Sequence, residues 1–276
     1  MARVDTQNIA RYWWDRRAPG LSLMHADFRT QEFAPHRHEA LVVAATEVGG
    51  AVVKSRGVAE QADASTLFVF NPAEPHAGWM GASPRWRYRS LYLELNAIEE
   101  IARGLGLQTV PYFTRNQLSD RELVSDFLAL HRALEDGRDS LLERELLMTS
   151  FATLFERHGS GGVRVERAPR DRTRFKMAVE YIRARLAEPL SLGELCARLG
   201  VTQYQLIRLF KLTTGLTPHA YITQLRLDAA CQYLADGRSI GDTAIAAGFY
   251  DQSALTHHFK RCYGVTPLQF ARAVRA

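Results

Sequence analysis

The chain has 276 residues, which is enough for two domains of ordinary size. Hydrophobic residues make up 46% and charged residues 24%, and no apolar run approaches the roughly 18 residues of a membrane span, so we expect a cytoplasmic protein with no membrane partner. The net charge of +5 is unevenly divided, because 17 Lys/Arg oppose 9 Asp/Glu from Arg164 to the end, whereas the preceding residues contain 18 and 21. This basic C-terminal part indicates contact with a polyanion.

Residues from about 20 to 95 are predicted to form strands and turns. Apolar runs of β-forming residues recur there, namely LVVAATEV, AVVKS, TLFVF and RSLYLEL, and turn-forming stretches such as GG and NPAEP separate them. Short strands at such close spacing predict an antiparallel barrel or sandwich.

Two histidine motifs accompany these runs. FAPHRHEALVV contains His36 and His38, which an alternating strand places on one face, and LFVFNPAEPHAGWM contains a P-x-x-x-H pattern that ends at His76. Together they resemble a cupin barrel, and three imidazoles suit Zn, Fe, Ni or Cu. The acidic ligand expected soon after the first motif is missing, because Glu39 points to the other sheet face and Glu47 is displaced. We therefore expect no metal and no other cofactor, which leaves the histidines as pocket or surface residues.

A small-molecule pocket is expected in this N-terminal part, because such pockets combine aromatic walls with a few polar groups. The candidate ligand-binding residues are His36, His38, His76, Trp79, Tyr88 and Tyr92. Trp13, Trp14 and Arg37 are candidates for an arm that closes over the pocket. The alternative for each aromatic residue is a place in the hydrophobic core.

Two helices are predicted after the strands, at 118–136 and at about 139–158. Ser119 is the expected N-cap of the first helix, with Glu122 three residues later. Its apolar stripe consists of Leu123, Phe127, Leu130 and Leu134. This stripe is either a dimerisation surface or the face that packs on the barrel. The Gly-rich, charged stretch HGSGGVRVERAPRDR then indicates a linker.

A repeat dominates the rest of the chain. FKLTTGLTP (Phe210–Pro218) returns as FKRCYGVTP (Phe259–Pro267), and LGELCARLGV at 192–201 matches IGDTAIAAGF at 240–249. Each copy predicts a short helix, a tight turn and a second helix, which is a helix-turn-helix unit whose second helix enters the DNA major groove.

Caps and core residues explain much of this repeat. Gly200 and Gly248 can take the positive φ that ends a first helix, and Gly215 and Gly264 end the second helices. The expected buried residues are Leu206, Phe210, Leu255 and Phe259. Thr217-Pro218 and Thr266-Pro267 predict an N-cap followed by the first residue of the next helix. Lys211 and Lys260 lie near helix C-termini, where they suit the helix dipole and can reach a phosphate.

From about 172 to 276 the sequence resembles the AraC/XylS family of bacterial transcription regulators, above all in GFYDQSALTHHFKRCYGVTPLQF. The resemblance implies seven helices with two helix-turn-helix units, preceded by a cupin-type domain that often binds a ligand and dimerises. The predicted DNA-binding residues are Gln203, Tyr204, Ile207, Arg208, Lys211, Gln252, Ser253, Ala254, Thr256, His257 and Lys260. Two of them depart from the family pattern. Ile207 stands where a polar residue is common and would contact a thymine methyl group, and His257 replaces a frequent Arg, which predicts weaker reading by the second unit.

The sequence thus predicts an α+β protein with a cupin-like β-barrel and following helices at 1–160, a linker at 161–172, and an all-α DNA-binding domain at 173–276. The expected function is sequence-specific transcription regulation, not catalysis. The expected partners are double-stranded promoter or operator DNA, a small-molecule effector, RNA polymerase and a second copy of the chain. Two alternatives are an N-terminal domain that only dimerises, and a metal-dependent cupin enzyme with an appended regulatory domain.

Overall fold

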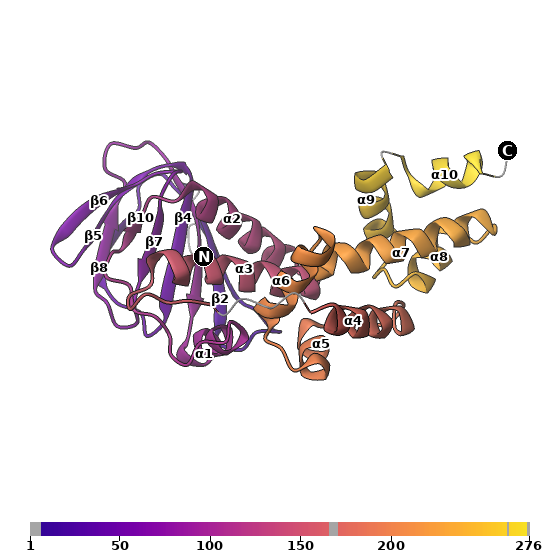
Figure 1. The fold of residues 1–276 in the computed structure, drawn as a ribbon. Coiled ribbons are helices and arrows are strands. Elements are labelled where there is room, and N and C mark those ends of the chain that lie inside the picture. The colour runs from indigo at the N-terminus through magenta and orange to yellow at the C-terminus, as the bar shows by residue number, and fades with distance from the viewer. Residues whose placement is uncertain (1–6, 166–170, 264, 275–276) are drawn as a thin grey trace. The chain divides into compact units, whose positions relative to one another are not determined.

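The structure, a computed structural model, describes residues 7–165, 171–263 and 265–274. Contacts divide the chain into two units, one formed by Met1–Gly137 with Leu146–Glu166 and the other by Arg138–Glu145 with Arg167–Ala276. Figure 1 shows the first unit as the strands and helices in indigo to magenta, and the second mainly as the helices in orange to yellow. Within the described ranges, no helix combines the length and the apolar character needed to cross a membrane.

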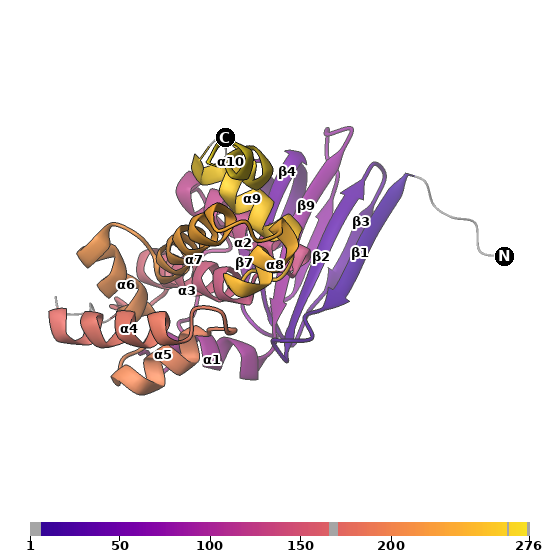
Figure 2. The same cartoon turned by 90° about the vertical axis from the view of Figure 1, so that its right-hand side faces the viewer.

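The first unit contains two antiparallel sheets that share a core, as predicted for a cupin-type domain. The larger sheet has the strand order β1 (Asn8–Trp14), β2 (Leu21–Phe28), β9 (Trp86–Leu93), β4 (Leu41–Gly49), β7 (Leu67–Phe70) and β10 (Gln117–Leu118). The smaller sheet has the order β3 (Glu32–His36), β8 (His76–Trp79), β5 (Ala51–Ser55) and β6 (Val58–Ala62). In Figure 2 the strands of the larger sheet lie side by side, with β1 at its edge.

Strand alternation places one face of each sheet inside the first unit. Phe68 and Val42 from the larger sheet join Val53 and Ala62 from the smaller sheet in one buried cluster. Burial of a valine or phenylalanine side chain contributes about 1.5–3 kcal/mol. The inner faces therefore hold the two sheets together.

Three helices follow or connect the strands: α1 (Leu95–Gly104), α2 (Arg121–Asp136) and α3 (Ser140–His158). The predicted helices at 118–136 and 139–158 are present as α2 and α3, but α2 begins only at Arg121, after Leu118 in strand β10, and the predicted cap is wrong. Asp120, not Ser119, caps α2, because its side chain accepts a hydrogen bond from the backbone N–H of Leu123. Gly137, with φ 67°, ends α2 in the left-handed conformation.

The apolar stripe of α2 faces the larger sheet. Leu123, Phe127 and Leu130 are no more than 2% exposed, and α2 contacts β4 and β9. The stripe is therefore not an exposed dimerisation surface. The alternative prediction, in which the stripe packs on the barrel, is the one that the structure supports.

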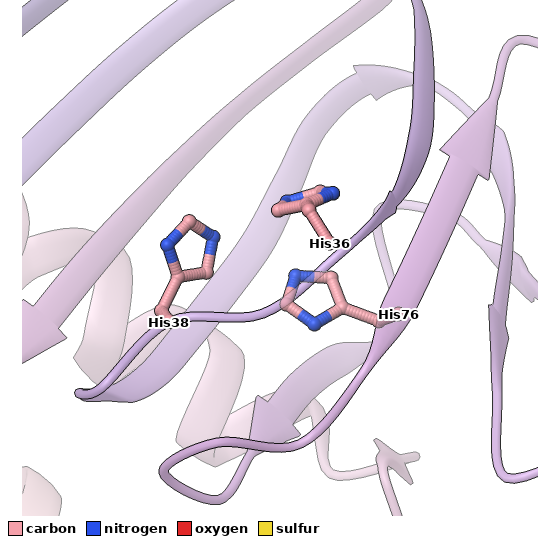
Figure 3. Close-up of side chains that lie close together, drawn as sticks. All are labelled: His36, His38 and His76. Atoms are coloured by element: carbon pink, nitrogen blue, oxygen red, sulfur yellow. The ribbon is translucent and has the colours of Figure 1, made fainter.

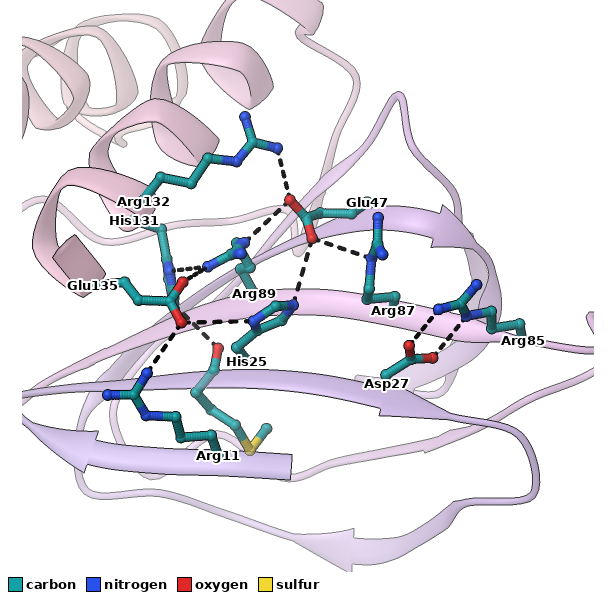
Figure 4. Close-up of polar contacts among 11 residues, drawn as sticks. Arg11, His25, Asp27, Glu47, Arg85, Arg87, Arg89, His131, Arg132 and Glu135 are labelled. Carbon is teal, nitrogen blue, oxygen red and sulfur yellow. Dashed lines mark hydrogen bonds and ion pairs between the residues drawn. The ribbon is translucent and has the colours of Figure 1, made fainter. Parts of the chain in front are cut away.

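Ion pairs also connect α2 to the outer face of the larger sheet (Figure 4). Glu47 on β4 is only 8% exposed in its side chain, and its carboxylate lies 3.1 Å from Arg89 on β9 and 2.7 Å from Arg132 on α2. Glu135 on α2 pairs with Arg89 as well, while His131 contacts the same guanidinium. These charges compensate one another, which allows Glu47 and Arg89 to be buried beneath α2.

The second unit is helical, as predicted. The described residues form α4 (Arg172–Ala184), α5 (Leu192–Leu199), α6 (Gln203–Thr214), α7 (Pro218–Ala235), α8 (Ile240–Ala246), α9 (Gln252–Tyr263) and α10 (Pro267–Ala273). One buried cluster joins Leu227 and Leu234 of α7 to Leu255 and Phe259 of α9. The long helix α7 thus forms the core against which the second half of the unit packs.

Candidate functional site

A cavity of about 640 Å³ lies between the two sheets of the first unit. Three aromatic residues of the lining come from β9, where Trp86, Tyr88 and Tyr92 face inward while Arg87 and Arg89 face outward. The remaining aromatic and imidazole rings of the lining belong to Tyr12, Phe33, His36, His38, Phe68, Phe70 and His76. This cavity is mostly apolar with a few polar groups, as ligand sites usually are.

Three histidines meet in the cavity wall (Figure 3). His36 at the end of β3 is the register partner of His76 at the start of β8, and His38 lies in the loop that leads to β4. The ring centroids are 4.5 Å apart for His36 and His76, 4.9 Å for His36 and His38, and 5.3 Å for His38 and His76. The predicted grouping of these residues is therefore present in the fold.

Aromatic packing keeps these imidazoles in an apolar environment. The ring of His76 stacks on Phe70 at 4.0 Å, and that of His38 meets Tyr92 edge-on at 5.1 Å. Burial lowers the pKa of His76 to about 4, although its hydrogen bond to the carbonyl of Glu74 acts in the opposite direction. Burial also lowers the pKa of His38. The two side chains are therefore neutral near pH 7.

The carboxylate of Glu74, two residues before His76, serves other contacts. Glu74 accepts hydrogen bonds from Arg56, Asn71 and Asn116 at 2.7 Å each. Burial would raise the pKa of Glu74, but these hydrogen bonds outweigh it and lower the value to about 2. Glu74 thus fixes the turn before His76 and does not point into the cavity.

Other expectations for the cavity need correction. Trp79 is absent from the lining because it lies three residues after His76 on β8 and so points to the opposite face. Trp13 packs its ring against His131, 5.8 Å away, outside the cavity. Arg37 pairs with Glu39 at 3.6 Å on the surface.

Two contributors to the cavity were missed from the sequence. Trp86 lies two residues before Tyr88 and therefore on the same face of β9, so strand alternation would have found it. Tyr12 on β1 also lines the cavity, but alternation alone would not have singled it out, because Trp14 shares its face and is absent from the lining.

The second unit contains both expected helix-turn-helix units. In the first, Gly200 ends α5 with φ 63°, and the side chain of Thr202 starts α6 in a capping box with Gln205. Gly215 ends α6, and Thr217 caps α7 with Pro218 in its first turn.

The second copy repeats this design. Gly248 has φ 88°, and an added Cβ would lie 2.4 Å from the carbonyl oxygen of Leu186, so only glycine fits the turn. Asp251 accepts from the backbone N–H of Ala254 at the start of α9, and Thr266 caps α10. Gly264, predicted to end α9, lies outside the described residues.

Two family models match the chain, an AraC-like ligand binding domain over residues 18–152 and a helix-turn-helix domain over residues 195–273. The chain is also 28% identical over 224 residues to the uncharacterized HTH-type transcriptional regulator YbfI of Bacillus subtilis, and this match covers 81% of this chain and 81% of YbfI. The chain belongs to the AraC family. It is a DNA-binding transcription regulator with a ligand-binding domain, and the expectation of a regulator rather than an enzyme is confirmed.

Two further proteins are similar to this AraC-family chain. The chain is 31% identical over 134 residues to the HTH-type transcriptional activator RhaR of Klebsiella pneumoniae, which covers 48% of this chain and 47% of RhaR. The solved DNA-binding domain of AdpA, in complex with a target DNA, is 27% identical, with a TM-score of 0.35 over 36% of this chain and 91% of that one.

Most of the predicted DNA-binding residues of this AraC-family regulator lie at least partly on the surface. The exposed ones are Lys211, Gln252, Ser253, His257 and Lys260, and the half-buried ones are Gln203, Tyr204, Arg208, Ala254 and Thr256. Gln203 accepts a hydrogen bond from Arg144 at 2.7 Å, and Ala254 packs on the core of its own half.

Ile207 is the exception, and the prediction that it faces a base is wrong for this structure. Its side chain is 0% exposed, as are those of Leu206 and Phe210. It lies one residue after Leu206 and three before Phe210, so the apolar face of α6 extends to include it.

Proposed function

We propose that this regulator binds promoter or operator DNA through α6 and α9, and that a small molecule bound in the cavity changes the strength of that binding. The cavity is the observation that supports the binding of a small molecule. Its volume of about 640 Å³ falls within the roughly 300–1,000 Å³ of typical ligand sites. A domain that only dimerised would not require such an unfilled space between its sheets.

On the DNA side, Arg208 and the exposed polar residues of α9 read bases, while Lys211 and Lys260 contact phosphates. The lysines lie in the last turns of α6 and α9, where they also suit the helix dipoles. The net positive charge of the C-terminal part supports this assignment.

On the effector side, the cavity favours a molecule with an apolar or aromatic body and one polar group. Trp86, Tyr88 and Phe70 offer flat apolar surfaces, and His38 and His76 offer polar ring atoms. Binding shifts the population of chains that can engage DNA, which is the usual basis of an effector response.

The regulator acts as a homodimer at two half-sites and contacts RNA polymerase at the promoter, as the family resemblance implies. Residues 1–160 form the sensing domain, 161–172 the linker and 173–276 the DNA-binding domain. Sedimentation of the full chain with and without DNA tests the dimer.

The test of the effector uses the full chain and DNA selected from a random pool. A metabolite panel is screened by melting temperature, because a compound that binds only the native state raises it. Ala44 lines the cavity, so Ala44→Phe should abolish the rise, whereas Ala59→Phe on the exposed part of β6 should preserve it. A rise that persists in Ala44→Phe would place the compound elsewhere. No rise for any compound would favour the dimerisation-only alternative.

A further inference from the structure

A metal site first requires ligand atoms that lie close together, and the three cavity histidines meet this requirement. His36, His38 and His76 each offer one ring nitrogen, and these three atoms lie within 4.8 Å of one another. They come from a strand end, a loop and a second strand, so the fold itself brings them together. Two of them, His36 and His76, face each other directly across paired strands.

The hydrogen bonds of two rings meet the second requirement. Nδ1 of His36 lies 2.8 Å from the carbonyl oxygen of Ala34, and Nδ1 of His76 lies 3.0 Å from that of Glu74. A carbonyl only accepts, so Nδ1 donates its proton and Nε2 keeps a free lone pair. Histidines that bind metals are commonly oriented in this way, by donating their second nitrogen to a carbonyl or carboxylate.

We propose that His36, His38 and His76 bind one divalent transition-metal ion such as Zn²⁺, and that the effector completes its coordination from the cavity. Only the coordination of the metal by the effector rests on the proposed function. The metal site itself depends on the three imidazoles alone.

The ligand set determines which ions fit. Three imidazoles with an open fourth position form a known zinc arrangement, and they suit Ni, Cu and Fe as well. The group contains no carboxylate, which disfavours Mg²⁺ and Ca²⁺. The expectation of no metal relied on that missing carboxylate, but a three-histidine site does not need one.

The geometry requires a modest adjustment. Nitrogens around a tetrahedral ion at 2.0–2.1 Å lie about 3.3 Å apart, so the rings must approach one another by up to about 1.5 Å. Rotation about the side-chain torsions supplies this movement, since the rings are half-buried and line an open cavity. Phe70 packs on the ring of His76 and Tyr92 on that of His38, so aromatic side chains lie beside the group that would hold the ion.

The first experiment measures metal binding by the full chain. Protein stripped with EDTA is titrated with Zn²⁺ by calorimetry and with Co²⁺ by visible absorption. We expect His38→Ala and His76→Ala each to weaken one Zn²⁺ site by more than about 100-fold, and His158→Gln, which alters a histidine outside the cavity, to leave that site intact. Asp139, His219 and His258 form a second potential ligand group, so the difference between wild type and variants is decisive. Equal binding by wild type and both alanine variants would overturn the proposal.

The second experiment separates the metal site from the proposed function. Acetohydroxamate, which coordinates metals, should change the Co²⁺ spectrum of the wild type, and acetamide should not. The metabolite panel is then repeated on stripped and on Zn²⁺-loaded protein. A compound that raises the melting temperature only of loaded protein supports both proposals. A compound that acts equally on stripped protein overturns the effector's coordination to the metal but preserves the proposed function. Zn²⁺ binding without any response to the panel preserves the metal site and contradicts the proposed function.

Discussion

Replacing Glu74 with glutamine should destabilise the first unit, because this carboxylate fixes the turn between β7 and β8. It is 8% exposed, forms two short contacts with Arg56, and accepts hydrogen bonds from Asn71 and Asn116. Glutamine keeps the shape but removes the charge, and its amide group would face donors rather than acceptors. The backbone carbonyl of the same residue orients His76, so the turn also positions the cavity wall.

The magnitude follows from the pKa of this carboxyl group. Its value falls from 4.5 to about 2 on folding. A difference of about 2.5 units corresponds to about 3 kcal/mol of folding free energy at pH 7. Because the folded-state pKa is depressed, this contribution is complete above pH 4.5 and is lost as the pH falls toward 2. At pH 3 less than about half of it should remain.

Urea unfolding followed by tryptophan fluorescence measures this effect selectively. All four tryptophans, at positions 13, 14, 79 and 86, belong to the first unit. Glu74→Gln should unfold about 3 kcal/mol more easily than wild type at pH 7, and the difference should shrink at pH 3. Glu99→Gln, at an exposed position of α1, is the matched control. A loss below about 0.5 kcal/mol, or an equal loss at both pH values, would refute the reasoning.

The second unit gives four further predictions. Arg208→Ala should cost about 1–3 kcal/mol of discrimination at one base pair, whereas Lys260→Ala should weaken binding to every sequence and reduce the salt slope by about one, as anisotropy titrations at several salt concentrations would show. Ile207→Ala should lower the stability of the helical unit by about 2–5 kcal/mol, with base preference unchanged, because its side chain is buried. Gly248→Ala should lower the midpoint of helix unfolding by circular dichroism more than Gly200→Ala, because only at Gly248 does a Cβ collide with the backbone. Equal effects of the two glycine substitutions would contradict the packing argument.

The features that sequence predicted best are those fixed by local chemistry. Thr217-Pro218 and Thr266-Pro267 start helices because a capping hydroxyl and a proline suit the first turn in any surroundings. The pairing of Gly200 with Gly248 likewise follows from backbone conformation. The local conformation at these positions follows from the residue type itself.

The features that sequence missed depend on tertiary neighbours. Ile207 looked like a surface residue because the family pattern places a reader there, yet its apolar side chain extends the buried face of α6. Trp79 is the exception, because its place outside the cavity follows from local alternation: it lies three residues after His76 on β8 and so points to the opposite face. The partners of Glu74 lie up to 42 residues away, so no local pattern could have revealed them.

The strand order of the larger sheet limits when this sheet can form during synthesis of the chain on the ribosome. β2 and β4 both pair with β9, and Leu21 finds its partner only at Leu93. During synthesis, at about 5–20 residues per second, both strands must therefore wait several seconds with unpaired edges. The helices of the second unit contact mainly neighbours that are close in the chain, so they fold quickly once made. By contrast, β2 and β4 can be joined into one sheet only after β9 has emerged from the ribosome.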